Sequence, residues 1–406
     1  MKAVETTKVS KGQRTKQLVL EKAVEVFREE GFQDGSIVMI ASRIGMTPSS
    51  IYKYFANKEA IYNELATTFK KLMIQRIRGA VDNRLDVSAN ITNIVKTYIS
   101  TIRENVALYD TFRQVEFVNL GLAKEYYREL TGAIKSCLDT RARDAIDTET
   151  VAYAIVGSIY LVVIQALIWG DGTGAAPEEI VPFILHGIDA RGDFVPYLLP
   201  RRRCSEPQQT ATSQGEITKR TIMKTAEHLF GRNGYHKTHT TDIATASDVG
   251  LGTIYLYFHS KKEILAELVR HVNHLLRACS SEYIKPYTDR RAVENAGFQA
   301  FFNVFEDRGE DYRIVREAEF VDKSIGIWYY RRIAESYQKG LEVAMQKGEV
   351  IDIDPLLLSY ALMGVGHTVG IRWYVIEKER SRDDRSILSM LEYAMHGVNG
   401  ILKENT

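Results

Sequence analysis

The sequence predicts an all-α protein made of two copies of one unit of about 200 residues. Apolar residues recur at helical spacing along the chain, and no alternating run flanked by hairpin turn signals is present. The phrase SSIYKYF at residues 49–55 returns as GTIYLYF at residues 252–258. The 406 residues are 45% hydrophobic and 26% charged, which is typical of a soluble globular protein with room for several domains.

The repeat continues through the whole chain. An offset of 203 residues aligns Phe27 with Phe230, Gly31 with Gly234, Lys58 with Lys261, and Tyr127 with Tyr330. The offset grows to 207 at Tyr153 and Tyr360, and to 210 at His186 and His396. This period is too long for a solenoid, so it predicts two copies of a complete domain pair.

Each unit opens with a predicted helix. In the first unit Leu20, Ala23, Val24 and Phe27 sit at i, i+3, i+4 and i+7, which places one apolar stripe on a helix over residues 15–30. Gly31 follows, and glycine commonly stands just past the end of a helix.

Two short helices are predicted next, over residues 36–44 and 48–54, with the sequence GMT between them. Two short helices joined by a tight turn that contains glycine are typical of a helix-turn-helix. Within this motif Thr47 would cap the second helix and Pro48 would occupy its first turn. Ile40, Ala41 and Ile51 would face inward. The opposite face would carry donor groups that suit phosphate oxygens and base edges, on Ser49, Ser50, Tyr52, Lys53 and Tyr54.

This motif resembles the DNA-binding domain of the TetR/AcrR family of transcriptional repressors. The first copy matches the family pattern at Phe27, Gly31, Phe32, Ile40, Ala41, Gly45, Met46, Thr47, Ile51, Tyr52, Tyr54, Phe55 and Lys58. The second copy matches it at Phe230, Gly234, Tyr235, Ile243, Ala244, Val249, Ile254, Tyr255, Tyr257, Phe258 and Lys261. The second copy departs from the pattern at Asp248, where the family usually has glycine in the turn. It departs again at Gly250, where serine or threonine usually starts the recognition helix.

The resemblance implies a DNA-binding transcriptional regulator, most simply a repressor released by a small-molecule effector. It implies five domains: 12–65, a first helix-turn-helix domain (the first head); 66–200, a first helical regulatory domain; 201–215, a linker; 216–269, a second helix-turn-helix domain (the second head); and 270–406, a second helical regulatory domain. The linker is poor in apolar residues and rich in Ser, Thr and Gln, which is typical of a flexible segment.

The resemblance also implies which residues contact DNA. They are Ser36, Thr47, Pro48, Ser49, Ser50, Tyr52, Lys53, Tyr54 and Lys58 in the first head, and Thr238, Gly250, Gly252, Thr253, Tyr255, Leu256, Tyr257 and Lys261 in the second. The residues matching Tyr52, Tyr54 and Lys58 approach phosphates in this family, and the residue matching Phe55 packs in the core. Lys53 and Leu256 differ between the copies where bases would be read, so the two heads should read different half-sites of an imperfect palindrome. The alternative is that the two tyrosines are core residues. The surplus of ten basic over seven acidic residues in positions 1–60 is too small to decide by itself.

The regulatory domains would bind the effector inside a helical bundle. The candidate pocket residues are Phe112, Glu116, Tyr127 and Tyr153 in the first unit, and Phe320, Tyr330, Tyr337, His367 and Trp373 in the second. Apolar walls with a few polar groups suit a small molecule, although the same side chains could simply fill the core. Glu116 and its counterpart could equally form structural ion pairs with arginines. Arginines near many aromatic side chains would suit an acyl-CoA or an aromatic acid.

The last two helices of each unit are where such proteins usually dimerise. They are predicted over residues 151–169 with 179–199, and 356–376 with 383–402. Residues 151–169 carry no charge, but a buried helix is favoured over a membrane span because Ser158 and Gln165 interrupt the run. Because both partners are tethered in one chain, the sequence predicts a covalent pseudo-dimer.

No catalytic, cofactor or metal site is predicted, so an enzyme is disfavoured. The sequence GDGTG at 170–174 lacks a preceding strand and a following GK[ST], and His186, Asp189 and His367 lack a third partner at metal spacing. The three cysteines lack zinc spacing and predict no disulfide, which favours a reducing cytoplasm. The polar N-terminus has no apolar core of a secretory signal. Two other functions stay open: a DNA-binding protein with one active head that works as a dimer of whole chains, and a helical enzyme.

Overall fold

The computed structural model describes residues 10–139, 141–170, 176–202, 213–306, 308–377 and 382–403. Every regular element within these ranges is a helix, and the β pairing there consists of isolated bridges, so the all-α prediction is confirmed. The chain divides into two compact units, Met1–Arg78 with Ser100–Glu129, and Gly79–Ile99 with Leu130–Thr406. Most of the predicted linker, residues 203–212, and most of the GDGTG stretch lie outside the described residues.

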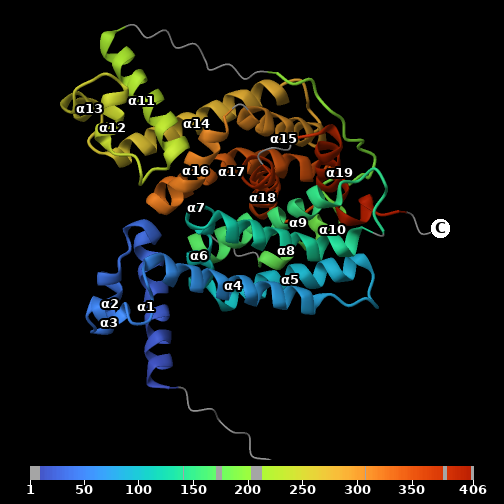
Figure 1. The fold of residues 1–406 in the computed structure, drawn as a ribbon. Coiled ribbons are helices and arrows are strands. Elements are labelled where there is room, and N and C mark those ends of the chain that lie inside the picture. Colours follow the sequence, from blue (N-terminus) through green and yellow to red (C-terminus); the bar gives the residue numbers. More distant parts are fainter. Residues whose placement is uncertain are drawn as a thin grey trace, which may run out of the picture. The chain divides into compact units, whose positions relative to one another are not determined.

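The two repeats contain their helices in the same order for most of their length. Figure 1 labels the α-helices of both repeats. The first repeat contains α1 Lys11–Asp34, α2 Ile37–Ile44, α3 Pro48–Ile51, α4 Lys58–Ala80, α5 Val87–Glu104, α6 Val106–Phe112, α7 Val115–Val118, α8 Leu120–Leu138, α9 Thr148–Val163, η1 Ile164–Trp169, η2 Pro177–Ile180 and α10 Val181–His186. The second contains α11 Gln214–Asn233, α12 Thr240–Ala246, α13 Leu251–Tyr257, α14 Lys261–Ile284, α15 Arg290–Glu306, α16 Gly309–Val321, α17 Lys323–Gln346, α18 Pro355–Ile371, η3 Arg372–Ile376 and α19 Asp384–Ile401.

The helix starts confirm the repeat register predicted from the sequence. Lys58 and Lys261 open α4 and α14, and the N-terminal residues of α8 and α17 are also 203 positions apart. The offset of 207 separates Thr148 and Pro355, which open α9 and α18. Positions related by these offsets can therefore be compared directly between the two repeats.

In the first unit, α1 buries Val19, Ala23 and Phe27, and the helix breaks at Gly31, whose φ is 75°. The break was predicted, because glycine adopts this left-handed backbone without a Cβ penalty. Gln114, between α6 and α7, then holds the end of α1. Its side-chain oxygen accepts a hydrogen bond from the Phe32 amide at 2.8 Å, and its nitrogen donates to the Phe27 carbonyl at 3.3 Å.

The contact between the two repeats lies within the second compact unit, which comprises residues 79–99 and 130–406. Helix α9 packs along α18, and α10 packs along α19 (Figure 1). Gly157 and Gly364 lie where α9 and α18 cross: a Cβ on either glycine would clash with the backbone carbonyl of the other. The Thr368 hydroxyl donates to the Tyr153 carbonyl across the same crossing at 2.7 Å. The two helices therefore approach to backbone contact.

Polar groups connect the repeats around this crossing. The Arg372 guanidinium of η3 lies 3.1 Å from the Asp147 carboxylate at the start of α9, and the Ser386 hydroxyl of α19 donates to that carboxylate at 2.8 Å. Burial alone would raise the pKa of Asp147, but hydrogen bonds from Thr150 and Ser386 and the charge of Arg372 lower it to about 2. A second buried ion pair joins Arg291 of α15 to Asp189, at 2.8 Å.

The helix predicted over residues 179–199 is confirmed only as far as His186, and its continuation to residue 199 is wrong. Helix α10 ends at His186 because Gly187 has φ 69° and ψ −164°, and Gly192 again has a positive φ. Pro196 and Pro200 then remove backbone donors that a helix needs. The chain runs extended along α15 instead. There Asn295 and Gln299 take over the backbone hydrogen bonds of this segment, for example from the Leu199 amide to the Gln299 side-chain oxygen at 2.7 Å.

The apolar stretch Thr148–Trp169 is the one described helix that is long and apolar enough to cross a membrane, and 83% of its most apolar window is buried inside the protein. This burial agrees with the prediction of a core helix. The prediction that no disulfide is present is wrong: Cys279 of α14 is disulfide-bonded, whereas Cys137 is a free thiol. Cysteine spacing along the sequence missed this bond because the fold decides which cysteines meet.

Candidate DNA-binding surfaces and ligand pocket

The first head has the predicted helix-turn-helix, with α2 and α3 joined by a turn at Gly45. Gly45 has φ 71°, and its amide donates to the Ser42 carbonyl at 3.2 Å. Ile40, Ala41 and Ile51 are 0–1% exposed, which confirms that they face inward. Phe55, predicted to lie in the core, is also buried.

Most of the predicted contact residues of the first head lie in α3 or directly beside it, since α3 ends at Ile51 and not at the predicted residue 54. Tyr52 is 54% exposed, and Thr47, Ser49 and Lys53 are also exposed. Ser36, Pro48, Ser50, Tyr54 and Lys58 are half-buried. Tyr52 is therefore available to a duplex, and the alternative that it is a core residue is wrong.

Thr47 stands at the N-cap position of α3 and Pro48 in the first turn, as predicted, but Thr47 makes no side-chain bond to a backbone amide. Its hydroxyl lies 2.9 Å from the Ser49 hydroxyl and 3.0 Å from that of Ser50. The predicted cap is therefore replaced by a cluster of three hydroxyl groups at the tip of the motif. Each of these groups can donate or accept a hydrogen bond.

Lys58 and Lys261 share a contact that the sequence did not suggest. The Lys58 ammonium donates to the Phe32 and Gln33 carbonyls at 2.7 and 2.8 Å, and it lies 4.5 Å from the centre of the Phe32 ring. The Lys261 ammonium donates to two backbone carbonyls and lies 4.0 Å from the Tyr235 ring centre. Each lysine thus ties the start of its helix to the backbone just past Gly31 or Gly234, the glycine that breaks or ends the first helix of the head. A further role in phosphate contact stays a prediction.

The second head repeats this geometry without glycine in the turn. Asp248 occupies the position of Gly45 and adopts the same left-handed backbone, with φ 54°. Its amide donates to the Thr245 carbonyl at 3.2 Å, as that of Gly45 does to Ser42. The departure noted in the sequence therefore leaves the turn intact. Asparagine and aspartate tolerate this conformation better than other side chains, but at a cost that glycine does not have.

We expect Asp248→Gly to raise the free energy of unfolding of the second head by about 1 kcal/mol, because glycine adopts a positive φ without strain. Thermal unfolding of the two proteins measures the effect. The matched control is Gly45→Asp, which places the same strain in the first head and should lower its melting temperature. An unchanged or lower stability of Asp248→Gly would contradict the assignment of strain.

The outer face of α13 is more apolar than that of α3. Leu256 is 82% exposed and Tyr255 is 50% exposed, while Gly250 and Gly252 bring no side chain to this face. The remaining predicted residues of the helix, Thr253 and Tyr257, are half-buried. The two heads therefore present the same scaffold with different chemistry at the tip.

Thr238 was predicted to contact DNA, and the structure contradicts this. Its side chain is completely buried, and its hydroxyl donates to the Gly234 carbonyl at 3.0 Å and to the Leu229 carbonyl at 3.2 Å. The predicted role is wrong because the loop between α11 and α12 turns this side chain inward.

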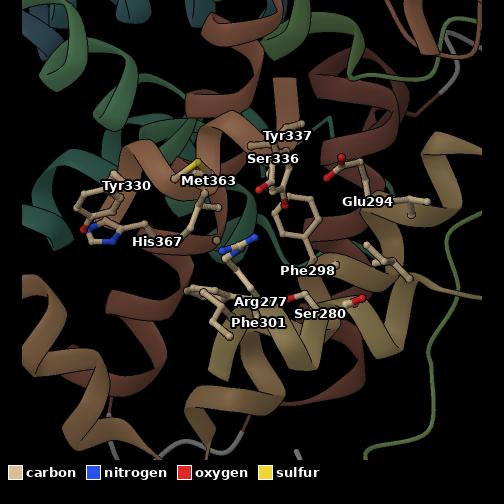
Figure 2. A pocket seen from close by; sticks show the side chains of 18 of the residues that line it. Arg277, Ser280, Glu294, Phe298, Phe301, Tyr330, Ser336, Tyr337, Met363 and His367 are labelled. Atoms are coloured by element: carbon tan, nitrogen blue, oxygen red, sulfur yellow. The ribbon is translucent and has the colours of Figure 1, made fainter. Parts of the chain in front are cut away.

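In the second repeat, a cavity of about 300 Å³ lies between α14, α15, α16, α17 and α18 (Figure 2). Its walls are mostly apolar and aromatic, and they include Phe298, Phe301 and Met363. Polar residues also enter the lining, among them Arg277 and Ser280 from α14 and Glu294 from α15. The volume and lining are typical of a small-molecule site.

Two polar clusters flank the cavity. At one end Glu294 is 1% exposed; burial raises its pKa, and Arg290 and Tyr337 partly oppose that rise. At the other end the Tyr312 hydroxyl donates to the His367 carbonyl at 2.6 Å. Arg277 has no ion-pair partner within the described chain, and its guanidinium points into the cavity (Figure 2).

The predicted pocket residues fall in three places. Tyr330, Tyr337 and His367 line the cavity. Phe320 and Trp373 do not line it; the Trp373 ring packs on Phe302, with 4.6 Å between ring centres.

In the first repeat the predicted pocket residues make internal contacts. Phe112 packs on Phe69, and the Tyr127 hydroxyl donates to Glu116 at 2.9 Å. Tyr153 lies at the crossing of α9 and α18.

Arg277, Ser280 and Glu294 were not predicted to form part of the pocket. On the sequence they are polar positions of amphipathic helices, which usually face solvent. No cluster of three His, Cys, Asp or Glu side chains that could hold a metal occurs among the residues that the structure covers.

Comparison with known proteins gives the following matches. The model of the family described as bacterial regulatory proteins, tetR family, matches residues 19–65 and 222–268. The uncharacterized HTH-type transcriptional regulator YdgC of Bacillus subtilis is 29% identical over 196 residues, which are 46% of this chain and 98% of YdgC. The HTH-type transcriptional activator FasR of Mycolicibacterium smegmatis is 32% identical over 101 residues, covering 25% of this chain and 46% of FasR. The crystal structure of AibR in complex with isovaleryl coenzyme A and operator DNA shares 16% identity and covers 44% of this chain and 98% of AibR, with a TM-score of 0.38.

Proposed function

Because the chain belongs to the TetR family of bacterial regulatory proteins and carries the family's DNA-binding domain twice, we propose that it is a cytoplasmic repressor released by a small molecule. One chain binds one operator through both heads. The observation that carries this proposal is the pair of matching helix-turn-helix scaffolds. Each has an exposed tyrosine, Tyr52 directly after α3 and Tyr255 within α13.

The contact between the repeats supports a pseudo-dimer within one chain. The last helices of the first repeat pack on those of the second, with Gly157 and Gly364 at the crossing of α9 and α18. Tethering makes this association intramolecular and raises its effective concentration. YdgC, which aligns over nearly its whole length with about half of this chain, has the size of one repeat.

The cavity of the second repeat supports the effector half of the proposal. It offers an apolar and aromatic wall together with the cationic Arg277. An acidic molecule with an apolar part, such as an acyl-CoA or an aromatic acid, has the complementary chemistry.

The test selects genomic DNA fragments that bind the purified chain, followed by footprinting and light scattering. We expect a footprint over two half-sites and a free protein of one chain, 46.1 kDa. Half-sites read by adjacent recognition helices should lie about 34 to 36 Å apart. A protein of twice this mass that protects one half-site per chain would favour the alternative, a dimer of whole chains with one active head. Absence of any selected fragment would overturn the proposal.

The two half-sites should differ, and Lys53→Leu tests this difference. The change gives the first head the residue that the second head has at Leu256. Leucine can contact a thymine methyl group but cannot donate to guanine, so the base preference in one half-site should weaken by about 1–3 kcal/mol per lost base contact. Base-by-base substitution of both half-sites measures the loss.

The matched control for this test is Lys124→Leu, because Lys124 is an exposed lysine of α8 outside the head. It should leave both half-sites unchanged. A symmetric operator with equal costs in both halves would contradict the assigned reading residues.

A further inference from the structure

We infer that only the second repeat binds the effector, so that each chain takes up one amphipathic acid rather than two. This inference rests on the proposed function and specifies it. We compared each residue that lines the cavity of the second repeat with the residue 203 or 207 positions earlier in the first. The helix starts confirm these two offsets.

Five residues that line the cavity are either glycine, which leaves space, or polar. The corresponding residue in the first repeat is isoleucine in all five cases. Arg277, Ser280, Glu294, Gly297 and Gly366 correspond to Ile74, Ile77, Ile91, Ile94 and Ile159. Each of these isoleucines is buried, with 0–4% of its surface exposed. At two of these positions the second repeat has glycine where the first has isoleucine. At the other three the second repeat has a polar side chain where the first has isoleucine. At these positions the first repeat therefore carries neither a glycine nor a polar side chain.

A sixth position follows the same pattern at one end of the cavity. Tyr337, which lies beside Glu294, corresponds to Ile134, which is 1% exposed. The polar cluster of Glu294, Arg290 and Tyr337 therefore has no equivalent in the first repeat. A buried carboxylate needs such partners, so the whole group differs together.

The ligand class follows from the charge in the cavity. Glu294 is paired with Arg290, whereas Arg277 points into the cavity without an ion-pair partner in the described chain (Figure 2). A guanidinium binds carboxylate or phosphate oxygens by paired hydrogen bonds. Phe298, Phe301 and Met363 complete an apolar wall for the rest of the molecule.

The first repeat nevertheless touches the wall of this cavity. The Tyr160 ring of α9 stacks on His367, with 5.2 Å between ring centres and 12° between planes. Trp169 packs on Tyr330 at 5.4 Å. A ligand that moves His367 or Tyr330 would therefore act directly on residues of the repeat that has no site of its own.

Calorimetric titration of the full chain with dodecanoate tests the inference. We expect one site per chain, no binding of dodecyltrimethylammonium, and at least about tenfold weaker binding of dodecanoate after Arg277→Ile, because a charge-assisted hydrogen bond is lost. The double variant Gly297→Ile with Gly366→Ile should lose binding. A Cβ at either glycine has ordinary contacts only, so this variant should fold. Gly132→Ile is its control, since a Cβ at this glycine of α8 meets open space.

The inference would be overturned by any of three results: two sites per chain, no binding of dodecanoate to the wild type, or an unchanged affinity of the Gly297→Ile/Gly366→Ile variant (the filled variant). The filled variant should still bind the selected DNA, but dodecanoate should no longer release it. Failure of the wild type to select any DNA would instead count against the proposed function. The two failures are therefore separable.

Discussion

Replacing Gly157 with leucine is expected to lower the free energy of unfolding of the second unit by about 3 kcal/mol, at the upper end of the usual cost of overpacking. The reason is the crossing of α9 and α18, where even a Cβ on Gly157 would collide with the Gly364 carbonyl and the Thr368 hydroxyl. Backbone atoms cannot rotate away as a flexible side chain can, so the two helices must separate. Thermal unfolding measures the loss.

The same variant tests the pseudo-dimer. If α9 and α18 hold the two repeats in register, Gly157→Leu should weaken binding to an operator with both half-sites more than binding to an isolated half-site. Gly132→Leu is the control, because its site on α8 is open. A Gly157→Leu protein that melts like the wild type would show that the helices do not depend on this close approach.

Arg372→Met should destabilise the chain by about 3 to 5 kcal/mol at neutral pH, because it leaves the Asp147 carboxylate without its buried cationic partner. Arg372 is 5% exposed and pairs across the repeats with Asp147 at 3.1 Å. Methionine retains much of the apolar stem, so the loss reflects the charge and its hydrogen bonds. Denaturant titrations of the wild type and the variant give the difference.

This difference should depend on pH in one direction. The folded-state pKa of Asp147 is about 2, below its ordinary value of 3.8. A group whose pKa is lowered by folding contributes stability above its unfolded pKa and loses it as the pH falls through the folded value. The gap between wild type and Arg372→Met should therefore be full above about pH 4 and shrink toward pH 2. A gap that stays constant over this range would contradict the role of Asp147 as the partner.

Local features of the chain were predictable because they depend on residues close in sequence. Gly31 breaks α1, Gly45 makes the turn of the first head, and the apolar positions of the motif face inward. The repeat was visible for the same reason, since aligned positions need no knowledge of the fold. Asp248 was noted as a departure, but the structure was needed to show that it keeps the left-handed turn.

The contacts between distant segments were not predictable in the same way. Lys58 looked like a phosphate contact, yet its ammonium also binds the carbonyls of Phe32 and Gln33, about 25 residues away in sequence. The helix predicted over residues 179–199 stops at His186, and the extended backbone that follows has its hydrogen-bond partners on α15. Thr238 is buried because its loop folds onto α11.

The sequence by itself determined that this protein is helical, that it contains two copies of one repeat, and that each copy begins with a DNA-binding motif. These features depend on residue spacing and turn residues, which act locally. Only the tertiary structure decided which polar residues of amphipathic helices face a cavity. Arg277 and Glu294 have the same helical spacing as solvent-facing residues. They line a cavity only because α14 and α15 pack beside α17 and α18, where Glu294 is buried and Arg277 stays exposed. The tertiary structure also shows which isoleucines of the first repeat correspond to cavity residues of the second. The sequence alone could not show this, because helix packing decides which side chains lie in the interior.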